Sequence, residues 1–282
     1  MRKQFWGGLI AMIAVVTAVI SWTTFTAHQA TNNYTYSNVP TLYLHGYGGG
    51  ASASNHQIAA AEKAGAATKV LTARVTKTGH VKLSGHWRSG KVNPLVQVIF
   101  ENNRNSDFKT DGQWLKNILT TLQSRYHIKQ FNVVAHSMGN MAVMYYETAN
   151  GQNKNLPQLN KQVDLAGHFD GILGRGDKPN QNRLLANGQP KTMDQNYRYL
   201  LAHINNYPSH QVRVLNIYGN LEDGSNSDGR VSNVSSRSLK YLLGNRPISY
   251  QEHMIKGKDA QHSKLHNNAQ VNRLVINFLW GK

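Results

Sequence analysis

Ser137 lies in a sequence pattern that can turn a hydroxyl group into a nucleophile. The motif A-H-S-M-G follows a short apolar run predicted as a strand (131–135) and precedes an apolar run predicted as a helix (138–149). At such a strand-to-helix turn the serine projects from the sheet edge, and the residues two before and two after it must be small. Gly139 meets this requirement, and Ala135 stands where glycine is more usual. The pattern predicts acyl transfer through a covalent intermediate on Ser137.

A glycine-rich segment early in the chain can supply the donors that this chemistry needs. Residues 41–46 are predicted as a strand that runs into H-G-Y-G-G-G. The oxyanion formed in acyl transfer needs two backbone N–H groups already in place, and we expect them from Met138 and Tyr47. A glycine run can also cradle a phosphate. However, no Lys-Ser/Thr pair follows as in a P-loop, and the G-x-G-x-x-G spacing is absent.

A serine nucleophile also needs a histidine base that a carboxylate orients, and the order expected along the chain is serine, acid, histidine. Asp228, in S-D-G-R-V-S, lies in the loop after a predicted strand (212–219) and is followed by Val231 and a predicted helix. Asp223, in E-D-G of the same loop, is the alternative acid, and either residue could also be a simple turn residue.

The base should lie between the last strand and the last helix. His262 and His266 both lie between the predicted strand 248–256 and the predicted helix 268–279. His253 lies within that strand and is expected to be structural. The spacing alone leaves His262 and His266 as alternatives.

These residues require a fold that brings distant loops to one sheet edge. Strands and helices alternate along the chain, which predicts a three-layer α/β fold with a mostly parallel sheet and helices on both faces. We expect one catalytic domain at 41–282. A Gly/Asn-rich insertion at about 167–191 is predicted to lie over the site. The expected strands are 41–46, a hairpin of 70–79 and 81–87, then 94–100, 131–135, 163–167, 212–219 and 248–256; the expected helices are 58–64, 111–126, 138–149 and 268–279.

The first thirty residues are typical of an export address. Arg2 and Lys3 precede a nearly continuous apolar run (5–22), and no clean A-x-A cleavage site follows. A cleaved signal peptide and a retained membrane anchor both fit this pattern. The polar, Pro-terminated residues 31–40 are predicted to be a linker. The rest of the chain is therefore expected outside the cytoplasm.

Composition excludes several classes of protein. The chain has 282 residues and no cysteine, which rules out a disulfide scaffold, a cysteine protease and a thiolate metal site. Its 31 Lys/Arg and 14 Asp/Glu give a net charge of +17, so we expect attraction to anionic cell wall or membrane surfaces. No nucleic-acid-binding motif is present. The charge also suits an alternative function, a non-catalytic basic protein that binds the cell wall or surface.

The motifs H-G-Y-G-G, A-H-S-M-G, S-D-G-R-V and H-S-K-L-H resemble those of cell-surface α/β-hydrolases of Gram-positive bacteria. That group, described as a domain of unknown function, is similar to secreted lipases and carboxylesterases, and the resemblance covers residues 40–282. It implies Ser137 as nucleophile and Asp228 as acid. The H-x-x-L pattern, with Val271 nine residues on, implies His262 as base. It further implies an extracellular esterase for short-acyl ester substrates that needs no metal or cofactor.

Overall fold

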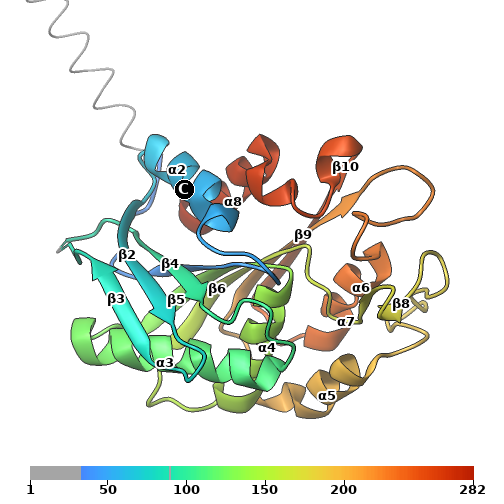
Figure 1. The fold of residues 1–282 in the computed structure, drawn as a ribbon, viewed down its shortest axis with the longest axis horizontal. Helices are drawn as coiled ribbons and strands as arrows, with labels where there is room; N and C mark the ends of the chain where they lie inside the picture. The colour runs from blue at the N-terminus through green and yellow to red at the C-terminus, as the bar shows by residue number, and fades with distance from the viewer. Residues whose placement is uncertain (1–32, 89) are drawn as a thin grey trace, which may run out of the picture.

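A twisted eight-stranded sheet forms the centre of the molecule (Figure 1). The structure is a computed structural model, and it describes residues 33–88 and 90–282. The strand order is β10-β9-β6-β5-β1-β4-β2-β3, and every neighbouring pair is parallel except β2 and β3. The strands of this sheet are β1 (Thr41–Leu44), β2 (Thr68–Val75), β3 (Val81–Gly85), β4 (Pro94–Phe100), β5 (Gln130–His136), β6 (Gln158–Leu165), β9 (Arg213–Asn220) and β10 (Ser249–Lys256).

Helices cover both faces of the sheet because the inner strands are apolar on both sides. In β1, Leu42 and Leu44 pack into one core cluster and Tyr43, between them, packs into the other. The first cluster includes residues of α3 (Phe108–Tyr126), α4 (Met138–Asn150), α5 (Gln195–His203) and α7 (Leu239–Leu243). The second includes residues of α2 (Ser52–Lys63) and α8 (Ala269–Trp280). Figure 1 shows these two groups on opposite sides of the sheet.

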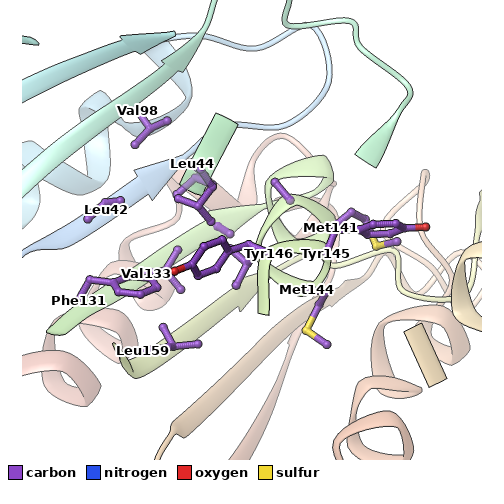
Figure 2. Packing of buried hydrophobic residues seen from close by; sticks show 14 of the residues in the cluster. Leu42, Leu44, Val98, Phe131, Val133, Met141, Met144, Tyr145, Tyr146 and Leu159 are labelled. Carbon is purple, nitrogen blue, oxygen red and sulfur yellow. The ribbon is translucent and has the colours of Figure 1, made fainter. Parts of the chain in front are cut away.

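Helix α4 packs closely on the central strands. Figure 2 shows Tyr146 of this helix among side chains of β1 and β5, including Leu44 and Val133. The rings of Tyr146 and Phe131 meet edge to face with centroids 6.1 Å apart. The two elements that flank the turn, β5 and α4, are therefore packed against each other in the core.

The predicted α/β class with a mostly parallel sheet is confirmed, and so is the hairpin formed by β2 and β3. The strand expected at 163–167 begins and ends earlier in the structure, at Gln158–Leu165. The prediction misses its first half because several residues there are polar, which hides the apolar pattern of a strand. Asn160 bonds Asn132 of β5, and Lys161 donates to the Phe278 carbonyl of α8. Helix α5 was not among the expected elements.

The beginning and end of the described chain pair with each other. Tyr34 and Gly281 form an antiparallel bridge, and the Thr35 amide donates to the Trp280 carbonyl at 2.7 Å. Asn93, immediately before β4, accepts from the Ser37 amide at 2.8 Å. The predicted linker at 31–40 is thus in contact with the domain from residue 34 onward.

The predicted export signal or anchor, residues 1–30, lies outside the described residues. Within the part of the chain that the structure does describe, no helix combines the length and apolar character needed to cross a bilayer. The segment 167–191 contains a two-stranded pair, β7 (Ile172–Leu173) and β8 (Gly176–Asp177), separate from the main sheet. The segment 167–191 begins just after the carboxyl end of β6.

Candidate active site

Ser137 occupies a sharp turn between β5 and α4. Its backbone has φ 54° and ψ −119°, a conformation that non-glycine residues rarely adopt and that costs energy. The surroundings hold it there: the Ser137 amide donates to the Leu165 carbonyl at 2.9 Å, and the Asn140 side chain donates to the Ser137 carbonyl at 3.1 Å. This turn is the geometry that presents a serine hydroxyl at a sheet edge.

Small residues around the turn are required by close backbone approach. A Cβ added to Gly139 would lie 3.0 Å from the His45 carbonyl oxygen, and one added to Gly46 would lie 2.8 Å from the Ser137 Cβ. Ala135 is fully buried, so its methyl group fits where the more usual pattern has glycine. The glycine-rich segment after β1 therefore packs directly against the serine turn.

Asp228, His262 and Ser137 form a continuous chain of hydrogen bonds. His262 Nδ1 is 2.8 Å from Asp228 Oδ2, and His262 Nε2 is 3.0 Å from Ser137 Oγ. Because a carboxylate only accepts, Nδ1 carries the imidazole proton and Nε2 accepts from the serine hydroxyl. All three residues are buried, with exposed fractions of 8% for Ser137, 1% for Asp228 and 9% for His262. The three predicted residues come from three separate loops and meet at one point.

The Asp228 carboxylate is fixed on both sides. Its Oδ1 accepts the amides of Arg230 at 2.8 Å and Val231 at 2.7 Å, while Oδ2 faces His262. The Asp228 carbonyl also accepts the His262 amide at 2.9 Å. The acid and base loops are thus joined through backbone as well as side chains.

The two alternative residues lie elsewhere. Asp223 is exposed, and hydrogen bonds from the Ser225 side chain and from the Ser225 amide, the latter at 2.9 Å, lower the Asp223 pKa. His266 lies beside the His136 ring with centroids 5.1 Å apart, and burial lowers its pKa. The hydrogen bonds to Ser137 and Asp228 are made by His262.

His136 lies against His262 and contacts the backbone of its loop. Its Nε2 is 3.0 Å from the His262 carbonyl oxygen, and the two rings lie 4.8 Å apart. Burial lowers the His136 pKa well below its usual value, so the ring is neutral, and its Nε2–H donates to the carbonyl. His136 was singled out only as part of the serine motif, yet it positions the base loop.

The two predicted oxyanion donors border Ser137. Tyr47 and Met138 both line the cavity that contains the serine, and within the described residues no hydrogen bond engages either backbone amide. The loop of Tyr47 is held by His45, whose Nδ1–H donates to the Gly46 carbonyl at 2.8 Å while Nε2 accepts the Phe100 amide at 3.0 Å. These amides are available to a ligand.

A cavity of about 1050 Å³ opens over the serine. One wall is aromatic: Tyr145 packs against Phe108 at 5.8 Å and stacks on Tyr199 at 4.9 Å, measured between ring centroids. His168 also lines the cavity, and burial lowers its pKa to about 4, which leaves it neutral at ordinary pH. The volume suits a ligand of drug-like size.

Comparison with known protein families identifies the family of this chain. A sequence model of one protein family, described as alpha/beta hydrolase of unknown function (DUF915), matches residues 28–282. The chain belongs to this family. The family and the fold predicted from the sequence motifs are both confirmed.

Two solved structures are similar to this α/β hydrolase over most of its length. The product of the gene lin2722 of Listeria innocua is 25% identical, with a TM-score of 0.75 over 86% of this chain and 93% of its own. A Lactobacillus plantarum protein proposed to be a cell surface hydrolase is 18% identical, with a TM-score of 0.66 over 87% of this chain and 90% of its own. A search of curated proteins finds no match.

Several cavity residues of this α/β hydrolase were not predicted as site residues. His168 and Arg175 lie in the predicted insertion and border the cavity, and Arg230 follows the acid by two residues. Their position just after the carboxyl ends of β6 and β9 was the available indication, since ligands of such sheets bind beyond that edge. Within the described residues, no group of three or more metal-binding side chains is placed to hold an ion.

Proposed function

We propose that this protein is a serine hydrolase that cleaves carboxylic esters through a Ser137–His262–Asp228 triad. The observation that carries the proposal is the hydrogen-bond chain of 2.8 and 3.0 Å that ends on the Ser137 hydroxyl at a strained turn. Such a chain is needed to activate a hydroxyl group, which is a weak nucleophile by itself.

In the first step, His262 Nε2 takes the proton of Ser137 Oγ as the oxygen attacks the ester carbonyl. Asp228 holds the tautomer that leaves Nε2 free to accept, and it stabilises the imidazolium that forms. The amides of Tyr47 and Met138 donate to the oxyanion, at about 3 kcal/mol of transition-state stabilisation per donor. His262 then gives its proton to the alcohol oxygen as the carbon–oxygen bond breaks.

In the second step, water attacks the acyl-serine ester. His262 takes a proton from the water and then returns it to Ser137 Oγ as the acid product leaves. No part of this cycle needs a metal or cofactor.

The segment that covers one side of the cavity, residues 167–191, favours short-acyl or water-soluble esters. The segment 167–191 contributes His168, Ile172 and Arg175 to the lining, and neighbouring positions are glycines. A polar, glycine-rich cover offers little apolar area for a long acyl chain, so the hydrophobic gain per added methylene is small.

The same proposal places the enzyme at the cell exterior. It is supported by the basic start and apolar run of residues 1–30, by the net charge of +17, and by the Lactobacillus plantarum relative proposed to be a cell surface hydrolase. The charge would retain the enzyme on anionic wall or membrane material.

The test is hydrolysis of p-nitrophenyl esters from acetate to palmitate by the purified protein, Ser137→Ala and Ser106→Ala. Ser106 lines the same cavity but has no contact with His262, so it controls for the loss of a serine hydroxyl. We expect activity on short chains that Ser137→Ala loses and Ser106→Ala keeps. Activity that survives in Ser137→Ala would disprove the nucleophile, and inactivity of the native protein on every ester would favour the non-catalytic alternative.

A further inference from the structure

Two exposed arginines, Arg175 and Arg230, line the cavity that contains Ser137. Arg175 lies in the turn between β7 and β8, and Arg230 lies in the loop that carries Asp228. The Leu173 amide donates to the Arg230 carbonyl at 2.9 Å, which joins the two segments. Both side chains are exposed to solvent at the mouth of the same cavity as Ser137.

These guanidinium groups have no acidic partner among residues 33–88 and 90–282. The salt bridges of this part of the chain pair other residues, and neither arginine side chain makes a hydrogen bond there. A third cation on the rim, Lys109, lies over the Tyr199 ring with its Nζ 4.8 Å from the centroid. The rim therefore carries three positive charges, none of which forms a salt bridge among the described residues.

The two acids that line the cavity do not neutralise it, because each caps a helix. Asp107 caps α3, accepting the Lys109 amide at 3.1 Å and the Thr110 hydroxyl at 2.6 Å. Asp194 caps α5, accepting the Tyr197 amide at 2.6 Å. A helix N-terminus has a partial positive charge that offsets a carboxylate at the cap. The net field at the cavity mouth is positive.

We infer that the site selects esters that also bear an anionic group, a phosphate or a carboxylate, which Arg175 and Arg230 bind. The inference rests on the proposed esterase function and names its substrate class. Guanidinium groups match both anions with paired N–H donors. The Arg230 amide donates to Asp228 Oδ1 at 2.8 Å, which fixes the backbone of Arg230 next to Asp228, and its side chain lines the same cavity as Ser137.

The experiment compares pairs of butyryl esters in which one member bears an anionic group and the other does not. The phosphate pair is 1-butyrylglycerol 3-phosphate and 1-butyrylglycerol; the carboxylate pair is 4-butyryloxybenzoate and 4-butyryloxybenzamide. For each pair the ratio of kcat/KM, anionic over neutral, is measured for the native protein and for the double variant Arg175→Gln/Arg230→Gln. Lys82→Gln, on the exposed edge strand β3, controls for the loss of charge alone.

We expect the native ratio for at least one pair to exceed one, and the double variant to lower it about tenfold, the scale of a hydrogen bond to a charged group. Lys82→Gln should leave the ratio unchanged. The pair with the larger effect identifies the anion. The thermal midpoint of each variant confirms that it is folded.

A native ratio of one or less for both pairs, or an equal ratio in the native protein and the double variant, would overturn the inference. If Ser137-dependent hydrolysis of the neutral esters is seen in that case, the esterase function stands without the anion selectivity. If the native protein hydrolyses none of the four esters, the proposed function fails and the inference fails with it.

Discussion

Asp228 and Asp223 lie in one loop but differ in burial and in partners. Asp228 is buried and faces His262 Nδ1, whereas Asp223 is exposed and bonds only within its own turn. Asp228→Asn keeps the shape but presents an amide to the imidazole, which favours the wrong tautomer. We expect kcat for p-nitrophenyl butyrate to fall on the order of 10⁴-fold, measured at saturating ester.

Asp223→Asn is the matched control, because it makes the same chemical change at an exposed residue of the same loop whose carboxylate bonds Ser225 and not His262. We expect its kcat to equal that of the native protein. Equal loss in both variants, or full activity in Asp228→Asn, would contradict the assignment of the acid. His262 and His266 allow the same comparison, since of these two histidines His262 is the one that hydrogen-bonds Ser137.

The site residues could be predicted from the sequence to different degrees. Ser137 follows from local pattern, because the strand, the small residues and the helix are all neighbours in the chain. The acid and base could be narrowed to two candidates each, since loop conformation decides which side chain reaches the serine. Arg175 and His168 could not be assigned, because their segment has no periodic pattern that fixes its path.

At the scale of elements, Gly219 of β9 allows the loop that carries Asp228 and the loop that carries His262 to lie close together. A Cβ at this position would clash with the Ala260 carbonyl oxygen and lie 2.9 Å from the Asp228 Cβ. Gly219→Ala should therefore separate the two loops and lower kcat/KM at least about tenfold, with a fall in thermal midpoint that reflects overpacking of roughly 1–3 kcal/mol.

Gly50→Ala is the control for this change, because a Cβ there meets no heavy atom within 4 Å and the residue has no positive φ. It should keep native activity and stability. A fully active Gly219→Ala would show that the close contact between these loops is not needed to hold the triad.

Helix α4 carries a buried carboxyl group, Glu147, whose Oε1 has no hydrogen-bond partner in the described part of the chain. Burial raises the Glu147 pKa to about 8. Between the usual value and pH 8 the unfolded chain has lost this proton while the folded protein keeps it. The free energy of unfolding therefore falls as pH rises through this interval. Glu147→Gln should be more stable than the native protein at pH 9, by about 1 kcal/mol or more.

Thermal or urea unfolding at pH 5 and pH 9 measures this difference, with the exposed Glu101→Gln as control. Asp111 and Asp164, whose pKa values burial raises to about 7, leave part of the pH dependence in place. An unchanged pH slope in Glu147→Gln would mean that this carboxyl group is not protonated in the folded protein.

Most elements could be predicted because the buried strands and amphipathic helices carry clear periodic patterns. The start of β6 and helix α5 could not. In β6, polar side chains are satisfied by tertiary contacts such as Lys161 with the α8 carbonyls. In α5, only Tyr197 and Leu200 are buried, so its apolar pattern is too short to detect.

At the scale of the whole molecule, the net charge of +17 predicts salt-dependent retention on anionic polymers. We expect the protein to bind phosphocellulose at low ionic strength and to elute as NaCl shortens the screening length to a few ångström, about 3 Å at 1 M. Unmodified cellulose is the control. Retention that persists unchanged in high salt would contradict an electrostatic attachment.

The pairing of Tyr34 with Gly281 has a consequence for how the domain can be displayed. Asn93, which holds Ser37, lies at the amino end of β4, whereas Ser137 lies beyond the carboxyl end of β5. Both ends of the described chain therefore leave the sheet on the edge opposite the cavity. A bead or fusion partner attached at either of these ends would leave the mouth of the cavity facing outward, and a permuted chain with these ends joined would keep the cavity intact.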